Sequence, residues 1–374
     1  MGLRLWSQPL GRNDMHALLP VTLLAASLLA GCSTFRSPMV VNDPPASVAA
    51  KPFPLNIHPI ALVLSGGAAR GFAHIGVIKV LEANGLKPDI IVGSSAGSIV
   101  GALYASGLTA AELESSLAQL DTSAFTDFVI PGLGFLPGEL GFVRGEKLHR
   151  FIDARLKTHR IQDFPIRFAA VATDLNSGKA VAFNAGDAGL AVVASSAVPG
   201  VIMPVEIDRR RYGDGQIASP LPVGTARALG AKMVIAVDVV YPPDHAFLYS
   251  AVGVLFQAFT ISVHQLKMAE ATQADLVITP DLGVTSGQMT FGDRERLIAV
   301  GEQEAIKMLP EIRAAFKPPA LPRQSKTSIT QWCRRLCFTR FSRTCCTNVA
   351  NNRHCRRRVP CMRERCCRSM LSLF

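Results

Sequence analysis

The sequence predicts an α/β fold in which a mainly parallel central sheet is flanked by helices. Strand-length and helix-length apolar segments alternate between Ile57 and Phe316, and such alternation is typical of a parallel sheet covered on both faces. About half of the 374 residues are apolar (49%), which is enough to bury a sizeable core. Only 18% are charged, so we expect no long disordered tract in the middle of the chain.

Each predicted element follows from its local pattern. The predicted strands are Ile60–Leu64, Ile90–Val92, Phe168–Thr173, Lys179–Phe183, Met233–Val239 and Leu276–Thr279, with shorter strand-like segments at Val201–Ile207 and Arg209–Tyr212. The predicted helices are Gly71–Asn84, a small-residue helix ending at Ser106, Ala110–Leu120, Gly145–Lys157, Asp187–Ala197, Ala246–Ala271 and Arg294–Phe316. Thr109 is expected to cap the helix that follows it, because its hydroxyl can accept a hydrogen bond from a first-turn N–H.

One of these helices contains a long uncharged stretch. Residues 246–266 include no Lys, Arg, Asp or Glu, which alone would suit a membrane span. The stretch lies between two predicted strands, however, and contains polar side chains such as Gln257 and His264. We therefore expect a helix buried inside the domain.

Charge and cysteine are concentrated at the end of the chain. Residues 325–374 hold twelve of the 39 Lys and Arg residues and one of the 28 acidic residues, so residues 1–324 are neutral overall. The net charge of +11 therefore does not indicate that the main domain binds nucleic acid. Eight of the nine cysteines lie between Cys333 and Cys367, and the ninth is Cys32. Residues 33–332 contain no cysteine, so we expect neither a disulfide framework nor a thiolate metal site in the main domain.

The Cys- and Arg-rich tail, residues 318–374, is open to three interpretations. It could bind zinc, although its cysteine pairs lack the C-x2-C spacing of zinc modules. It could be a basic tail that binds a surface. It could also be disordered or a non-native extension, and the abrupt change in composition after Pro322 favours this last interpretation.

The N-terminus has the pattern of a secretion signal. Leu18–Ala30 is apolar but shorter than the ~20 residues that span a bilayer. It leads into L-A-G-C at residues 29–32, which resembles the lipobox of bacterial lipoproteins. The resemblance implies that residues 1–31 are a signal peptide and that Cys32 is lipidated. The alternative is an ordinary buried cysteine in a short apolar helix.

A lipidated cysteine would anchor the protein in a bacterial cell envelope. The residue after the cysteine is Ser33 and not an aspartate. By the same resemblance, this favours the outer membrane, with the protein facing the periplasm. Residues 32–56 are rich in Pro, Ser, Val and Ala, and are expected to be a flexible tether to a domain at residues 57–317.

The first strand-to-helix turn, S-G-G-A-A-R-G at residues 65–71, presents backbone N–H groups where negative charge is stabilised. The charge could belong to a phosphate or to the oxyanion of a tetrahedral intermediate. Ala68 breaks the G-x-G-x-x-G spacing of dinucleotide sites, and Phe72 replaces the lysine of a P-loop. An oxyanion hole is therefore favoured, with a tight turn that binds nothing as the alternative.

The second such turn is G-S-S-A-G at residues 93–97. In a G-x-S-x-G motif, the glycines, here Gly93 and Gly97, allow a sharp turn that lifts the middle serine out of the sheet. Ser95 is therefore a candidate nucleophile, and the alternative is a serine that caps the next helix.

A serine nucleophile needs a base, which is usually a histidine held by a carboxylate. An α/β-hydrolase has the order Ser, acid, His, which Asp238 and His264 would satisfy. Only two predicted strands precede Ser95, however, whereas that fold places its nucleophile later, and His264 lies in mid-helix. His74 is expected to be packed in the core. A glycine-flanked aspartate, Asp214, would by itself be an ordinary turn residue.

Together these motifs resemble the patatin-like phospholipase family. The resemblance covers about Ile60 to Thr279. It rests on the order and spacing of A-L-V-L-S-G-G-A-A-R-G-F-A-H-I-G-V-I-K-V-L-E from residue 61, I-V-G-S-S-A-G-S-I-V-G-A-L-Y-A-S-G from residue 91, A-S-S-A-V-P-G at 194–200 and R-Y-G-D-G at 211–215. It implies a three-layer α/β/α fold and a serine lipid acyl hydrolase.

The resemblance also implies a dyad without histidine, with Ser95 as nucleophile and Asp214 as general base. The glycine that follows the base, Gly215, is present, but Gln216 stands where the family usually has glycine or alanine. Aspartate is a weak base, with an ordinary pKa of ~3.9. An apolar pocket that excludes water is expected to raise the pKa of Asp214.

The same resemblance assigns the oxyanion hole to the amides around Gly66, Gly67 and Ala68. Arg70 would buttress the turn, which ends at Gly71. Ala68 departs from the family, which usually has a third glycine there, but it retains an N–H group.

The expected substrate is a phospholipid or another lipid ester, as for a phospholipase A or a lysophospholipase. The alternatives are a general carboxylesterase and a catalytically inactive lipid-binding lipoprotein, for which Gln216 is the only hint. We expect no metal, no cofactor and no nucleic-acid partner, and a membrane contact through the lipid anchor. The sequence does not indicate an oligomeric state.

Overall fold

The computed structural model describes residues 43–48, 58–128, 141–243, 250–283 and 291–317. The predicted signal peptide, Cys32, most of the tether and the tail lie outside these ranges. The strands are β1 (Ile60–Leu64), β2 (Ile90–Ser94), β3 (Arg167–Asp174), β4 (Ala180–Phe183), β5 (Val205–Ile207), β6 (Arg210–Gly213), β7 (Met233–Val237) and β8 (Leu276–Ile278).

These strands form one sheet in the order β5-β6-β3-β2-β1-β7-β8, with β4 also paired to β3. The strands from β3 to β8 in this order run parallel to one another. The antiparallel strands β4, β5 and β6 extend the sheet beyond β3. The predicted fold class, a mainly parallel sheet in an α/β fold, is therefore confirmed.

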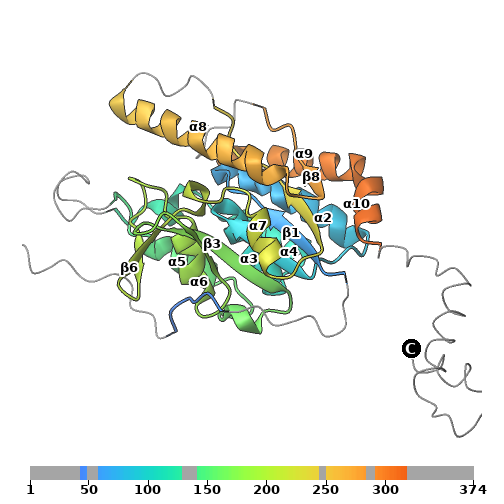
Figure 1. Cartoon of the computed structure of the whole chain (residues 1–374), viewed down its shortest axis with the longest axis horizontal. Coiled ribbons are helices and arrows are strands. Elements are labelled where there is room, and N and C mark those ends of the chain that lie inside the picture. The colour runs from blue at the N-terminus through green and yellow to red at the C-terminus, as the bar shows by residue number, and fades with distance from the viewer. Residues whose placement is uncertain (1–42, 49–57, 129–140, 244–249, 284–290, 318–374) are drawn as a thin grey trace, which may run out of the picture. The chain divides into compact units, whose positions relative to one another are not determined.

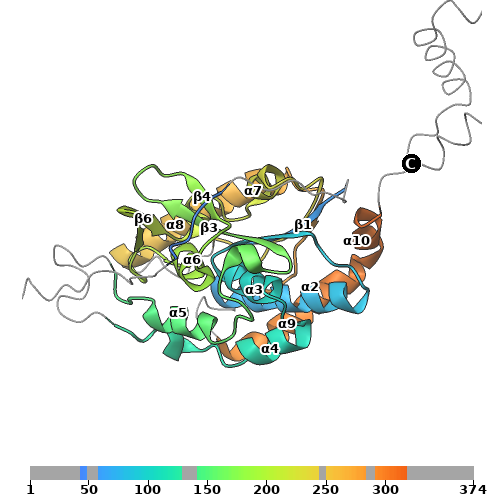
Figure 2. The ribbon, with the colours of Figure 1, turned by 90° about the horizontal axis from the view of Figure 1, so that it is seen from below.

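Helices cover both faces of this sheet (Figure 1). They are α2 (Phe72–Ala83), α3 (Ala96–Ala105), α4 (Ala110–Leu117), α5 (Glu146–Asp153), α6 (Ala188–Ser195), α7 (Val223–Ala228), α8 (Ala251–Ala271), α9 (Arg294–Lys307) and α10 (Leu309–Ala315). Figure 2 shows α2, α3, α4 and α9 on one side of β1, and α7 and α8 on the other.

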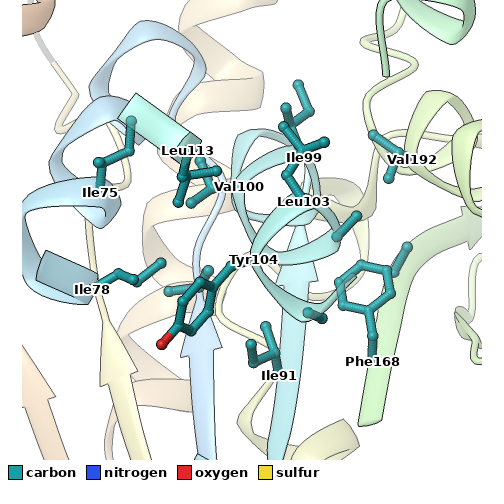
Figure 3. Close-up of a cluster of buried hydrophobic side chains, with 14 of the residues drawn as sticks. Ile75, Ile78, Ile91, Ile99, Val100, Leu103, Tyr104, Leu113, Phe168 and Val192 are labelled. Atoms are coloured by element: carbon teal, nitrogen blue, oxygen red, sulfur yellow. The ribbon is translucent and has the colours of Figure 1, made fainter. Parts of the chain in front are cut away.

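The sequence of β1 explains this arrangement, because all five of its residues are buried. Ile60, Leu62 and Leu64 pack in the larger core with the helices α2 and α3, whereas Ala61 and Val63 pack on the opposite face with α7. Successive side chains of a strand point to opposite faces, so a strand between two helix layers must be apolar throughout. Figure 3 shows side chains from α2, α3, α4 and α6 meeting those of β2 and β3 in the larger core.

Local sequence patterns predicted the positions of most helices. Thr109 caps α4 as predicted: its Oγ1 accepts the N–H of Glu112, and the Glu112 carboxylate accepts the N–H of Thr109 in return. The helix predicted over Arg294–Phe316 is divided into α9 and α10 at Met308, because Pro310 lies in the first turn of α10 and has no N–H to continue a helix. The short helix α7 was not anticipated.

The prediction of a buried helix at Ala246–Ala271 is wrong in its burial. The structure describes α8 from Ala251, and several of its apolar side chains are exposed, including Leu255 and Met268. Within the described ranges, no helix combines the length and the hydropathy that crossing a membrane requires.

Part of the predicted tether is bound to the domain. Ala46 pairs with Ala185 in an antiparallel bridge, and the Asn184 side chain bonds both the N–H and the carbonyl of Val48 at 2.7 and 2.8 Å. Asp43 forms an ion pair of 2.9 Å with Arg160. The chain is thus attached to the domain well before β1 begins.

Helices α2 and α9 pack closely enough to require glycine. A Cβ on Gly301 would lie 2.1 Å from the carbonyl oxygen of Ala73, and one on Gly76 would lie 2.0 Å from that of Ile298. We expect Gly301→Ala to lower the free energy of unfolding by about 1–3 kcal/mol, because the two helices must separate. Urea titration measures this change.

Gly224 provides the matched control, since it is also helical but has no atom within 4 Å of its would-be Cβ. Gly224→Ala is expected to be neutral or to stabilise by up to about 1 kcal/mol. Equal urea midpoints for the two variants would contradict the close packing of α2 on α9.

Candidate active site

Ser95 occupies the turn between β2 and α3, at the carboxyl edge of the parallel strands. Its φ of 50° lies in the left-handed region, which a non-glycine residue adopts only under strain. A Cβ on Gly93 would lie 2.3 Å from the carbonyl oxygen of Gly97, and one on Gly97 would lie 2.2 Å from that of Leu64. The turn that presents Ser95 therefore requires both glycines.

Asp214 follows β6 and lies beside Ser95, although 119 positions separate them in the sequence. Ser95 Oγ donates a hydrogen bond of 2.7 Å to Asp214 Oδ2. The second carboxylate oxygen, Oδ1, accepts the backbone N–H of Gln216 at 2.8 Å. A Cβ on Gly215 would lie 2.1 Å from the carbonyl oxygen of Val171, so this turn also needs its glycine.

The environment of Asp214 changes its acidity. Its side chain is fully buried. Burial raises the pKa of Asp214 from 3.8 to about 6, and the hydrogen bonds from Gln216 and Ser95 oppose that rise only in part. A carboxylate that titrates closer to neutral pH accepts a proton more readily than an ordinary aspartate does.

The glycine-rich turn at residues 65–71 lies on the other side of Ser95. The N–H of Gly66 donates to the carbonyl oxygen of Pro220 at 3.2 Å, so it is occupied. In the described part of the chain, the N–H groups of Gly67 and Ala68 have no bonded acceptor. Ala68 lines the same cavity as Ser95. The three predicted amides are thus reduced to two, at Gly67 and Ala68.

Contacts from distant segments hold this turn in place. The Arg70 guanidinium donates to the carbonyl oxygen of Gly283 at 3.1 Å and lies over the Tyr241 ring, 5.1 Å from its centroid. Burial lowers the pKa of Arg70, while the nearby Tyr241 opposes this. A Cβ on Gly71 would lie 2.7 Å from Ala96 Cβ, so this glycine lets the turn pack against the start of α3.

Comparison with known proteins shows which family this part of the chain is similar to. Residues 62–227, which contain Ser95, Asp214 and the glycine-rich turn, match the family described as patatin-like phospholipase. We call the segment that carries this match the patatin-like domain. An uncharacterised NTE family protein of Mycobacterium tuberculosis is 39% identical over 181 residues, which are 48% of this chain and 48% of that protein.

Two further proteins are similar to the patatin-like domain and its surroundings. Lysophospholipase NTE1 of Yarrowia lipolytica is 27% identical over 289 residues, covering 70% of this chain and 20% of the relative. The crystal structure of VipD from Legionella pneumophila aligns with a TM-score of 0.44 at 14% identity, over 75% of this chain and 72% of that chain. The match thus spans about half the length of the Mycobacterium protein and a fifth of the Yarrowia protein.

Ala68 and Gln216 depart from the family pattern, and the structure shows how each is accommodated. Ala68 has a φ of 47°, in the left-handed region that favours glycine. The Gln216 side chain lies against Gly66: its Cδ is 2.3 Å from where a Gly66 Cβ would be. Gln216 therefore packs the turn after Asp214 against the glycine-rich turn. The Asp214 carboxylate still accepts the hydrogen bond from Ser95.

Ala68→Gly should stabilise the domain. The left-handed conformation destabilises alanine by about 1–2 kcal/mol, and the greater freedom of glycine in the unfolded chain offsets part of this. We expect a net gain in the free energy of unfolding of about 0.5–1 kcal/mol, measured by urea titration. The N–H group remains, so ester turnover should stay within a few-fold. A loss of stability would show that the Ala68 methyl makes packing contacts that outweigh the strain.

Ser95 opens into an apolar cavity of about 100 Å³. Among the described residues that line it, the only polar side chains are Ser95 and Ser196. The larger apolar side chains of the lining are Phe72, Ile99, Val100, Leu117, Leu120, Phe125, Val198, Val201, Ile202 and Phe291. The Phe291 ring stacks on the Phe125 ring, with 6.0 Å between their centroids, and lies edge-on to the Phe72 ring, with 6.2 Å between their centroids. The cavity suits a hydrocarbon chain.

No histidine belongs to the described lining of this cavity. His74 is fully buried, as predicted, and its Nε2 lies 2.9 Å from the carbonyl oxygen of Ser65. Burial lowers the pKa of His74 to about 4, so it remains neutral and supports the glycine-rich turn.

One group in the described ranges has the side chains of a metal site: His149, Asp153 and Asp187. His149 Nε2 lies 3.3 Å from Asp187 Oδ1, and its Nδ1 lies 3.5 Å from Asp153 Oδ2. The hydrogen bond to Asp187 raises the pKa of His149. Asp187 also caps α6. None of the three lines the cavity. Their ion pairs join α5 to the start of α6.

Some residues of the site were missed. Ser195 Oγ accepts the backbone N–H of Ser95 at 3.0 Å and donates to the carbonyl oxygen of Val171, which fixes the strained turn. The A-S-S-A-V-P-G segment that contains Ser195 and Ser196 was part of the family resemblance, but nothing in it indicated these contacts. Phe291 had no recognisable signal in the sequence.

Proposed function

We propose that the patatin-like domain hydrolyses carboxylic esters of lipids, as a phospholipase A or a lysophospholipase does. Ser95 would be the nucleophile and Asp214 the general base. The observation that carries the proposal is the 2.7 Å hydrogen bond from Ser95 Oγ, which lines an apolar cavity, to the buried Asp214 carboxylate. The likeness to a protein named as a lysophospholipase supports the choice of substrate class.

In the proposed reaction, Asp214 takes the Ser95 proton while Oγ attacks the carbonyl carbon of the ester. The carbonyl oxygen becomes an oxyanion, which the unoccupied N–H groups of Gly67 and Ala68 stabilise. When the tetrahedral intermediate collapses, the C–O bond to the alcohol or lysolipid breaks, and Asp214 returns the proton to that leaving oxygen.

A water molecule then repeats the sequence on the acyl-enzyme. Asp214 accepts a proton from water, hydroxide adds to the acyl carbon, and Ser95 leaves with the proton from Asp214. The products are a free fatty acid and the original enzyme.

Labelling and turnover together test this function. A fluorophosphonate should form an adduct on Ser95, located by mass spectrometry of the peptides. The full-length protein should release fatty acid from phospholipid or lysophospholipid vesicles, and also hydrolyse p-nitrophenyl butyrate. Turnover of p-nitrophenyl butyrate alone would indicate a general carboxylesterase, which the small cavity would suit. Absence of both the adduct and turnover would indicate a protein that binds lipid without catalysis.

We further propose that the domain is held at the outer membrane, on its periplasmic side, by a lipid on Cys32. The support is the L-A-G-C sequence at residues 29–32. Mass spectrometry of the mature protein should show that it begins at Cys32 and carries acyl chains. An unmodified N-terminus upstream of Cys32 would refute the anchor and leave the hydrolase proposal untouched.

A further inference from the structure

Helix α8 has its polar side turned toward the protein. Its buried side chains include Gln257, Thr260 and Lys267. Lys267 Nζ forms an ion pair of 2.8 Å with Asp238, and both side chains are almost fully buried. At the end of the helix, Glu270 bonds the Ser219 hydroxyl and accepts the backbone N–H of Leu221 at 2.7 Å.

The opposite side, here called the outer face of α8, is apolar and exposed. Its large side chains and their exposed fractions are Val254 50%, Leu255 71%, Ile261 44%, Leu266 39% and Met268 52%. The other exposed positions of the helix are Ala251, Ala258, Ser262, Gln265 and Ala269. None of these ten described positions carries a charge. Figure 1 shows α8 along the outside of the domain.

The polar contacts fix this orientation. Rotating α8 to bury its outer face would break the pair between Lys267 and Asp238 and would leave buried charges without partners, which is strongly destabilising. Isolated exposed apolar residues are ordinary, but an uncharged stripe of this length marks a surface that contacts something apolar.

The width and area of the outer face favour a lipid surface as its occupant. At 3.6 residues per turn, its ten positions span an arc of about 160°, whereas a partner helix in a coiled coil covers the narrower stripe of two heptad positions. A 21-residue helix is about 30 Å long and about 10 Å wide. The curved surface of a 160° arc on such a helix is on the order of 500 Å², which is below the ~800 Å² that each partner of a stable protein interface buries.

We propose that the outer face of α8 docks the domain on a lipid bilayer, with its apolar side chains inserted at the headgroup boundary. The choice of lipid as occupant rests on the proposed lipid hydrolase function. α8 also packs against the Gly215–Ile217 turn that follows Asp214. Docking through α8 would therefore hold the catalytic turn within about one helix diameter of the membrane surface.

A fluorescent reporter on the outer face tests the docking without relying on activity. Leu255→Trp would be made in the full-length chain with Ser95→Ala, so that the lipid is not consumed. Ile306→Trp is the matched control, since Ile306 is 55% exposed on α9, outside the outer face. The signal of the parent chain is subtracted; it comes from Trp332 and, where residues 1–31 are still present, from Trp6.

With vesicles of equal parts phosphatidylcholine and phosphatidylglycerol, Leu255→Trp emission should move to shorter wavelength and be quenched by brominated lipid. Ile306→Trp emission should do neither, even if an anchor at Cys32 holds both variants on the vesicle. No shift for Leu255→Trp would overturn the proposal. A shift that occurs without vesicles and grows with protein concentration would also overturn it, and would assign the face to a second copy of the chain.

Charge on the outer face should affect only membrane-bound substrate. Leu255→Glu with Ile261→Glu is expected to reduce phospholipid hydrolysis in vesicles by on the order of tenfold per side chain, and to leave p-nitrophenyl butyrate turnover unchanged. Ile306→Glu should change neither. Unaltered vesicle hydrolysis in the double variant would refute the docking. Absence of all ester hydrolysis would refute the proposed function instead, and the fluorescence result would still decide the docking.

Discussion

Replacing Ser95 with alanine is expected to slow ester hydrolysis by a factor of at least about 10⁴. The hydroxyl is the only nucleophile that the Asp214 carboxylate contacts, through the 2.7 Å hydrogen bond, among the described side chains. The Gly67 and Ala68 amides would remain, so only the residual catalysis that an oxyanion hole and substrate binding provide is expected. Initial rates with p-nitrophenyl butyrate and with phospholipid vesicles measure the loss.

The matched control is Ser106→Ala at the far end of α3. Ser106 is also buried, and its hydroxyl donates to the carbonyl oxygen of Leu103 at 2.8 Å, away from the cavity. This variant should keep the wild-type turnover number and lose only about 1 kcal/mol of stability. Activity within tenfold of wild type in Ser95→Ala, with the circular dichroism spectrum unchanged, would assign the nucleophile to another residue.

The strands were predictable because their signal is local. β1, β2 and β7 are buried along almost their whole length, so their apolar runs report burial on both faces. The same reasoning failed for α8, because an uncharged stretch has the same composition whether it is buried or exposed. What fixes α8 is Asp238 and Ser219, which bind Lys267 and Glu270 and come from other parts of the chain.

The residues of the site likewise include some that the sequence predicted and others that depend on distant contacts. The G-x-S-x-G motif identified Ser95 as a candidate, and the family resemblance implied Asp214 as its base. The structure places their side chains in contact. The occupied N–H of Gly66 was not predictable, because its acceptor belongs to Pro220. The cavity likewise depends on Phe291, nearly 200 positions after Ser95. Such contacts are set by the way the sheet and its helices pack, which no local pattern contains.

Replacing Asp214 with asparagine is expected to lower kcat/KM by about 10²–10⁴, the usual contribution of a general base. Asparagine has nearly the same shape, and its carbonyl oxygen can still accept the N–H of Gln216. In the wild-type protein, Asp214 must be deprotonated to act as base. With its pKa raised to about 6 by burial, kcat/KM should rise as pH increases through about 6 and then level off. A flat profile from pH 4 to 8 would contradict this role.

The same substitution should make the protein more stable above pH 6, which separates a catalytic defect from a folding defect. The pKa of Asp214 is about 6 in the folded protein and 3.8 as its ordinary value. Below pH 3.8 the carboxyl is protonated in both states and burial carries no charge penalty. The penalty grows between pH 3.8 and 6, and is complete above pH 6 at about 3 kcal/mol. Asp214→Asn removes it, so the urea midpoint of the variant should exceed that of the wild type at pH 8, and the two should converge near pH 4. A variant that is both inactive and less stable at pH 8 would indicate that Asp214 supports the fold, and the loss of activity would then say nothing about a base.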